Sequence, residues 1–453
     1  MEANSSAFLL SLAALSVAAL LVLIIRLKIH AFAALTLVSA VTAIAAGVEL
    51  DQVVPTMTKG LGGTLASVSL LVGLGVMIGK LLEVTGGAAV LANAMIGRFG
   101  EHRAPLALGV ASLLFGFPIF FDAGLIVMMP IIFSVAARLG GSVLLYGLPA
   151  AGAFAVMHGL VPPHPGPVAA ADLLGTNLGF LVGMGLLIGL PTWYLASYLF
   201  GLWAGKRFHI PMDGALFSQR ELDDDNAPSF ATVLGLLVLP VLLIFLNSGL
   251  NTLSVAGVVD GSATWVKALR LLGNTPIALL ITLLACLLVF APKLGRARME
   301  ALCGESLGPI CGVILVTGAG GMFGGVLRAS GIGDALAAAL SDTGLPVIVA
   351  AFVISTCIRV AQGSATVALT TTAALMAPVV AATSGLSQVD LACIVIAIAG
   401  GATVLSHFND SGFWLVSRLF NMDEATTLRT WTVMETLIGS IAFIFALLVS
   451  LVF

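Results

Sequence analysis

The 453-residue chain has few charged side chains: 19 Lys and Arg and 22 Asp and Glu together make only 9% of it. Soluble domains are charged at about a quarter of their positions, so this composition excludes an ordinary soluble protein. With 59% hydrophobic residues and a mean hydropathy of +1.14, the chain is typical of a membrane protein. Its net charge of −3 offers no basic surface, and we expect no nucleic-acid partner.

The chain is also poor in residues that hold metals or cofactors. Its five cysteines lie in apolar segments without metal-ligand spacing, which favours small buried hydrophobes: Cys286, Cys303, Cys311, Cys357 and Cys393. No His-Glu-x-x-His run and no Walker-type phosphate loop is present. We therefore expect no metal, no cofactor and no catalytic residues, and an intramembrane enzyme is only a remote alternative.

What the chain does have is long apolar runs, each able to cross about 30 Å of hydrocarbon as a helix. The sequence predicts an all-α polytopic membrane protein in a lipid bilayer. The predicted spans are 7–25, 29–48, 61–79, 142–172, 177–204, 230–247, 274–291, 303–327, 387–418 and 431–453. Two further apolar blocks, 104–139 and 345–385, have polar or glycine-rich midpoints and predict re-entrant helical hairpins.

Two of these spans are interrupted. Residues 157–167 contain four prolines, two glycines and two histidines, and proline removes a backbone donor and clashes with the preceding turn. The second interruption is the polar run at 406–412. Irregular backbone at membrane depth is tolerated only inside protein or beside a water-filled cavity, so both breaks indicate a ligand site.

The two halves of the chain resemble each other. Residues 79–87 match 325–333 at an offset of 246, and His158 matches His407 at an offset of 249. We predict two inverted-topology repeats, 1–205 and 230–453, separated by a polar cytoplasmic loop at 206–229. Each repeat would contain a hairpin (104–139, 345–385) and a broken helix (142–172, 387–418).

The distribution of Lys and Arg predicts the orientation. With both hairpins re-entrant, fourteen of these residues fall on the inner side. Four fall on the outer side: Lys59, Lys267, Arg270 and Arg328. Under the positive-inside rule, this bias places both termini in the periplasm, the first hairpin on the cytoplasmic side and the second outside.

The irregular segments are the predicted site, because half-helix N-termini present unpaired N–H groups that attract an anion. A small carboxylate is therefore the expected substrate, with side-chain hydroxyls and amides to contact its other polar groups. The candidate substrate-binding residues are Gly116, Asp122, His158, Gln362, Gly363, Ser364, Thr366, His407, Asn409 and Ser411.

Asp122 and Asp410 are the only acids that the sequence places deep in the bundle, where an ionised carboxylate is expensive and usually functional. With the matched His158 and His407, they are the candidate proton-coupling residues. The alternatives are that each acid caps a half-helix and that each histidine is a packing residue. Arg359 lies within a hairpin, where it can bind a substrate carboxylate, pair with an acid or reach the interface.

Four segments in order, 115–122, 158–167, 362–368 and 406–414, resemble the gluconate permease family, which is similar in plan to the ion transporter superfamily. The resemblance implies proton-coupled symport of gluconate or a related sugar acid across a bacterial inner membrane. Family members also carry idonate, ketogluconates, fructuronate, glycerate and D-serine, so another small carboxylate, a dicarboxylate or sodium coupling remains open. The superfamily analogy adds a homodimer as an expectation.

Overall fold

The computed structural model describes residues 5–208, 210, 227–255, 258–407 and 410–452, and every regular element within them is a helix. The first half contains α1 (Ser6–Leu21), α2 (Ala31–Ala45), α3 (Leu50–Val84), α4 (Gly87–Phe99), α5 (Ala104–Phe115), α6 (Phe121–Leu139), α7 (Val143–Leu160), α8 (Pro165–Leu174), α9 (Leu178–Thr192) and α10 (Phe200–Arg207). Short π-helical or 3-10 segments join some of them: η1 (Val22–Arg26), η2 (Glu101–Arg103) and η3 (Trp193–Leu199).

The second half contains α11 (Phe230–Val255), α12 (Thr264–Leu272), α13 (Thr275–Leu294), α14 (Arg296–Ala329), α15 (Ile332–Thr343), α16 (Val347–Gln362), α17 (Ala365–Ala382), α18 (Gln388–Thr403), α19 (Ser411–Leu419), α20 (Glu424–Thr427), η5 (Leu428–Thr432) and α21 (Val433–Val452). The all-α membrane architecture is confirmed, because nine helices in the described residues are long and apolar enough to span a bilayer. The number is ten if the bent α6 is counted as one span. Most of the polar loop predicted at 206–229 lies outside the described residues.

Helix lengths differ from the apolar runs that predicted them. α3 has 35 residues and α14 has 34, against predicted spans at 61–79 and 303–327. Charged residues ended those apolar runs, but Lys, Arg and Glu are good helix formers and the helices continue through them. α2 is shorter than its predicted span 29–48, with 15 residues.

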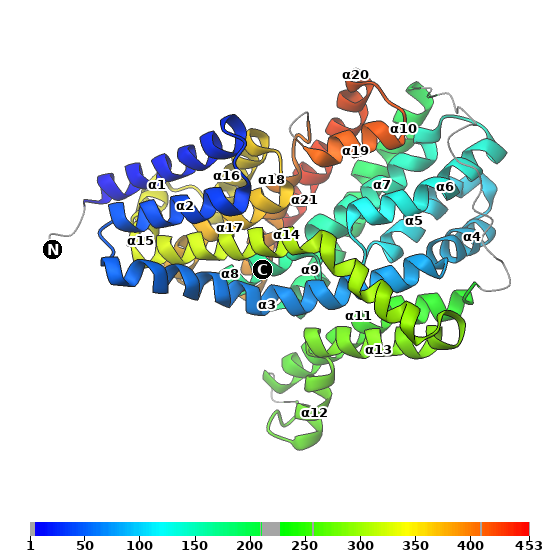
Figure 1. Cartoon of the computed structure of the whole chain (residues 1–453), viewed down its shortest axis with the longest axis horizontal. Helices are drawn as coiled ribbons and strands as arrows, with labels where there is room; N and C mark the ends of the chain where they lie inside the picture. Colours follow the sequence, from blue (N-terminus) through cyan, green and yellow to red (C-terminus); the bar gives the residue numbers. More distant parts are fainter. Residues whose placement is uncertain (1–4, 209, 211–226, 256–257, 408–409, 453) are drawn as a thin grey trace.

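The long helices α3 and α14 lie side by side and antiparallel through the molecule (Figure 1). Glycines make their close approach possible. A Cβ on Gly60 would lie 2.5 Å from the carbonyl oxygen of Gly321, and one on Gly325 would lie 3.3 Å from the Cα of Gly60. Small residues at such crossings let helix backbones pack directly in membranes.

Each predicted hairpin is a pair of helices joined by a short turn. α5 and α6 are joined at 116–120, and α16 and α17 at 363–364. In Figure 1, the first pair lies with α4 at one end of the long axis, and the second lies with α15 at the other. The predicted interruptions are also present: α7 and α8 are separated by 161–164, and α18 and α19 by 404–410.

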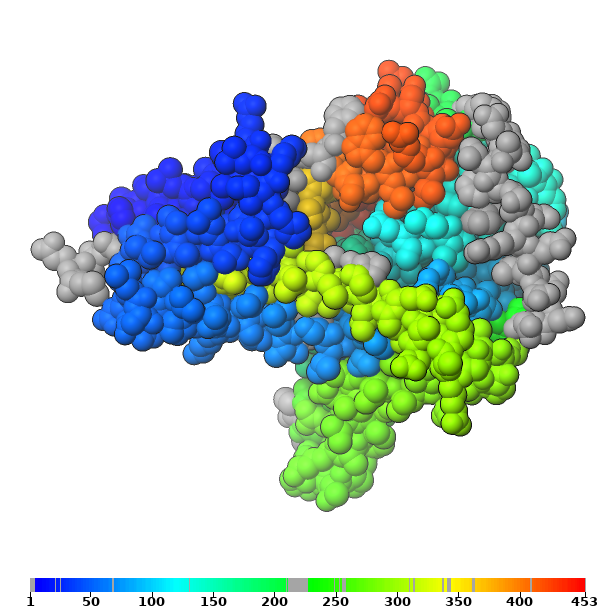
Figure 2. All heavy atoms as spheres, in the orientation of Figure 1, coloured from blue at the N-terminus to red at the C-terminus, as the bar shows by residue number. Residues whose placement is uncertain are grey.

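The two halves are interleaved. α8 of the first half packs on α17 of the second, where a Cβ on Gly166 would lie 3.0 Å from Leu369. α19 of the second half in turn contacts α6 of the first. On one side, α12 and the adjoining ends of α11 and α13 project from this body (Figure 2).

Candidate substrate site

Both helix breaks contact a hairpin, and we call the shared region of 116–120, 161–164, 363–364, 404–407 and 410 the junction. His164 Nε2 lies 2.9 Å from the Gly116 carbonyl oxygen, which joins the first break to the first hairpin. His407 Nε2 lies 3.1 Å from the Val360 carbonyl oxygen, which joins the second break to the second hairpin. The ring of Phe121, at the start of α6, lies 5.3 Å from that of Trp431 between centroids, and the Trp431 indole nitrogen donates to Ser406 Oγ at 2.8 Å. The four irregular segments therefore meet.

Local sequence explains each irregularity. Pro162 and Pro163 push the preceding residues out of helical geometry, and α8 restarts with Pro165 at its first position, where proline is well accommodated. α16 ends at Gln362, and Gly363 caps it with a φ of +87°, which suits glycine. Ser364 then caps α17 by accepting a hydrogen bond from the Val367 amide at 3.4 Å.

An ion pair lies in the second half of the junction. Arg359 Nη2 is 2.5 Å from Asp410 Oδ2, and the two side chains are 2% and 13% exposed. Arg359 also donates from Nη1 to the Gly363 carbonyl oxygen. Of the roles left open for Arg359, the structure has it paired with an acid and bound to the hairpin turn.

The two predicted acids have different surroundings. Asp410 caps α19, accepting from the Gly412 amide at 3.0 Å, and its Oδ2 also accepts from Ser406 Oγ at 2.5 Å. Asp122 is the second residue of α6, is exposed, and makes no capping bond. It lies close enough to Asp410 for their charges to repel. The capping alternative therefore applies to Asp410 and not to Asp122.

The first half of the junction contains a cluster of three rings. His158 lies 4.9 Å from His164 and 5.6 Å from Phe120, measured between ring centroids. His164 follows the last residue of α7 by four positions, as His407 follows the last residue of α18. His164 and His407 also make equivalent bonds to hairpin carbonyls, although the sequence offset matched His407 with His158.

The remaining predicted residues lie at or near the second hairpin turn and break. Thr366 is in the first turn of α17, and Ser411 is the exposed first residue of α19. Gln362 is the last residue of α16, but its side chain lies outside the described residues, as does Asn409 altogether. The expected roles of those two amides stay predictions.

Glu435 was missed. The expectation that Asp122 and Asp410 are the only deep acids is wrong, because Glu435 on α21 is 6% exposed and lies within electrostatic range of both Arg359 and Asp410. Thr432, three residues before Glu435, contacts the second break, because its Oγ1 donates a hydrogen bond to the Ser406 carbonyl oxygen. A single Glu inside the apolar run 431–453 is the signal that could have found it, since an intramembrane acid is functional by default.

Comparison with known families gives the class of protein. Residues 8–452 match the family model described as GntP family permease. The chain belongs to this permease family. It is a multi-pass membrane transporter and not an enzyme, and the resemblance seen in its sequence is confirmed.

Relatives of this permease match it over nearly their whole length. It is 35% identical to a gluconate permease of Pseudomonas aeruginosa, with 99% of each chain covered. It is 37% identical to the inner membrane permease YgbN of Escherichia coli, covering 97% of this chain and 98% of that one. Among solved structures, the YdaH transporter of Alcanivorax borkumensis has a TM-score of 0.61 at 15% identity, with 90% of both chains covered, so it is similar in fold.

Three buried polar atoms around the permease's junction lack a hydrogen-bond partner in the described part of the chain. They are His158 Nδ1, Arg359 Nε and Glu435 Oε1. Buried polar groups are nearly always paired, so these three atoms are available to bind a polar ligand or water. Among the described side chains, no group of three or more His, Cys, Asp or Glu is placed to hold a metal ion.

Proposed function

We propose that this permease is a proton-coupled symporter that carries gluconate or a closely related sugar acid into the cell. The observation that carries the proposal is the unpartnered Nε of buried Arg359, a cationic donor beside two irregular helix breaks. A guanidinium suits a carboxylate ligand in both charge and geometry. Relatives named as gluconate permeases support gluconate as the first acid to test.

We propose two inverted repeats as the architecture, with both hairpins re-entering the membrane and both termini in the periplasm. The order α5 to α8 recurs as α16 to α19, and the hairpins lie at opposite ends of the molecule, which supports this arrangement. The bias of Lys and Arg supports the orientation.

In the proposed site, the substrate carboxylate binds near Arg359 and the N-termini of the half-helices. α8 and α19 both begin in the junction, so their first N–H groups and helix dipoles favour a negative charge there. The hydroxyls of the substrate then contact Ser364, Thr366 and Ser411, with Gln362 and Asn409 as further candidates.

Coupling follows from competition for one cation. Asp410 holds Arg359 while it is ionised, so an incoming carboxylate meets an occupied guanidinium. A proton on Asp410 removes this competitor, and the site then accepts one proton together with one anion. Asp122 and Glu435 lie within electrostatic range of Asp410 and form a route for that proton, with His158 and His407 on the surrounding segments.

Uptake into proteoliposomes tests the proposal. We expect an inward pH gradient alone to drive accumulation of radiolabelled gluconate, and a sodium gradient at equal pH to drive none. Accumulation driven only by sodium would replace the proton in the mechanism. Competition by unlabelled D-serine, glycerate and a dicarboxylate would identify the acid, since the true substrate suppresses uptake at the lowest concentration.

The homodimer is a separate proposal. Large apolar side chains are exposed on α11, α12 and α13, including Leu242, Trp265 and Leu288. A second copy of the chain would cover part of this surface. Crosslinking through a cysteine introduced at Leu288 in native membranes should give a dimer, and a cysteine at Leu37 on α2 is the matched control.

A further inference from the structure

A cavity lies away from the junction, between α3, α8 and the end of α14. Its volume is about 540 Å³, and it is lined by Thr56, Lys59, Gly60, Gly63, Thr64, Asp172, Leu173, Gly325, Arg328 and Ala329. This volume lies within the range of about 300–1,000 Å³ that is usual for small-molecule sites.

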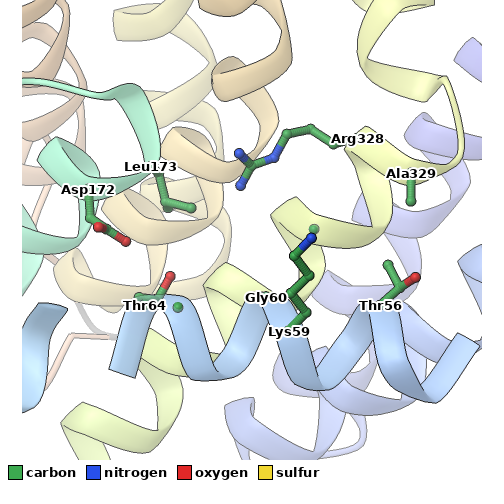
Figure 3. Close-up of a pocket in the computed structure, with 10 residues that line it drawn as sticks. Thr56, Lys59, Gly60, Thr64, Asp172, Leu173, Arg328 and Ala329 are labelled. Atoms are coloured by element: carbon green, nitrogen blue, oxygen red, sulfur yellow. The ribbon is translucent and has the colours of Figure 1, made fainter. Parts of the chain in front are cut away.

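The close crossing of α3 and α14 builds this cavity. The glycine contacts at Gly60 and Gly325 bring the two backbones together, so that Lys59 and Arg328 project into one space from facing helices. Figure 3 shows the ammonium of Lys59, the guanidinium of Arg328 and the carboxylate of Asp172 directed into that space. The Arg328 Nε–H donates to the Gly324 carbonyl oxygen at 3.4 Å, which helps to orient the guanidinium.

The cavity is separate from the proposed transport site. Gly75 on α3 marks the junction, because a Cβ there would lie 3.6 Å from Pro163. Gly60 lies fifteen residues earlier on the same helix, about 22 Å away at 1.5 Å per residue, whereas Asp172 at the near edge of the cavity lies seven residues along α8 from Pro165, about 10 Å. A small acid whose carboxylate is held by Lys59, next to Gly60, therefore cannot also reach the junction.

The charges of the cavity favour an anion. Lys59 and Arg328 are two of the four basic residues that the sequence places on the outer side, and both are exposed. Asp172 reduces the excess to one positive charge, and it offers acceptors for hydroxyl groups. A small hydroxy acid fits this lining better than a simple anion. Its carboxylate would pair with the two cations, and its hydroxyls would contact Asp172 and the two threonines.

We propose that this cavity is an outer capture site, which binds the small hydroxy-carboxylate anion before it reaches the junction. The ligand class and the outer position rest on the proposed function. Lys59 and Arg328 hold the carboxylate, and Asp172, Thr56 and Thr64 contact the hydroxyls. Opposite charge at the entrance raises the local concentration of substrate and its rate of association.

Transport kinetics of K59Q/R328Q test the capture site. The gluconate KM should rise about tenfold, the equivalent of about 1.4 kcal/mol, with maximal uptake unchanged. K267Q/R270Q is the matched control, since both of its residues lie on α12 outside the cavity, and its KM should stay within about twofold of wild type. The difference between the two variants should shrink in 1 M salt, where the Debye length falls to about 3 Å.

Direct binding separates the possible outcomes. Equilibrium dialysis of the detergent-solubilised protein should give two gluconates per chain for wild type and one for K59Q/R328Q. Wild-type binding and KM in that variant overturn the capture site and leave the transport function intact. Failure of wild type to take up gluconate under any gradient overturns the proposed function instead.

An anionic lipid headgroup is the competing source of negative charge. Phosphatidylglycerol retained by wild type and lost from K59Q/R328Q, with gluconate binding equal in both, assigns the cavity to lipid and overturns the proposal. If the double variant is not recovered as a folded monodisperse protein, K59Q and R328Q are measured singly. Each should raise KM about threefold, in line with half the tenfold effect on a logarithmic scale.

Discussion

Removing both members of the Arg359–Asp410 pair should cost less stability than the two single removals added together. Asp410→Asn keeps the size of the side chain and its ability to cap α19, because Asn and Asp are comparable caps. The substitution leaves the Arg359 guanidinium 2% exposed, with the Gly363 carbonyl as its remaining partner among the bonds described above. The perturbation is therefore an unpaired buried charge and little else.

The magnitude follows from burial. Breaking a buried ion pair from one side costs about 3–5 kcal/mol, because the remaining charge is desolvated without compensation. Arg359→Gln should cost less, since Asp410 keeps the Ser406 hydroxyl and the Gly412 amide as donors. The double variant buries neither charge. We expect its loss of unfolding free energy to be about 2–3 kcal/mol smaller than the sum of the two single losses.

Equilibrium unfolding of wild type, both single variants and the double variant in detergent micelles measures this coupling. Additivity within about 0.5 kcal/mol would refute the buried-pair argument. Glu435 is the internal control, because it is another carboxylate within electrostatic range of Arg359. If Glu435 takes over as partner, D410N/E435Q will be clearly less stable than D410N.

Three further predictions follow from the same geometry. Glu435→Gln should abolish accumulation driven by a pH gradient while retaining substrate counterflow, whereas Glu424→Gln, at an exposed position of α20, should behave as wild type in both uptake assays. Gly363→Ala should lose about 1–2 kcal/mol of stability, because its φ is +87°, and it should also lose transport, because the Gly363 carbonyl accepts from Arg359. Gly385→Ala, with a φ of +84° in a distant turn, should lose stability and keep transport. Equilibrium unfolding and uptake measure the two effects. Gly321→Ala should destabilise by about 1–3 kcal/mol, because its Cβ would lie 2.8 Å from the Gly60 carbonyl oxygen, while Gly312→Ala on the same helix meets nothing within 4 Å and should not lower the melting temperature.

The backbone of the site was predictable, because the prolines at 162–167 and the glycine at 363 have strong local effects. Each of them fixes where a helix ends, and the observed breaks lie at those places. The position of Asp410 before α19 likewise indicated a cap, which the structure contains. Such features depend on neighbours in sequence, so a single chain reveals them.

The contacts across the junction were not predictable in the same way. Arg359 and Asp410 lie 51 residues apart, and nothing in either segment indicates the other as its partner. Glu435 was overlooked because the apolar residues around it satisfy a hydropathy window despite one acid. The histidine correspondence also changed, since a constant offset matched His158 with His407, whereas the contacts match His164 with His407. Packing decides these relations, and it brings together residues from distant helices.

The interleaving of α8 with α17 has a consequence for how the protein is made. During synthesis the first half enters the membrane while its partner surface does not yet exist, because α17 follows α8 by about 190 residues. Until then the face of α8 that packs on α17 lacks its partner, although the break at 161–164 already contacts Gly75, Gly116 and Gly185 of the first half. A chain ending after residue 229 should therefore be degraded on its own and rescued when residues 230–453 are expressed beside it. The site is completed only when the last helices arrive.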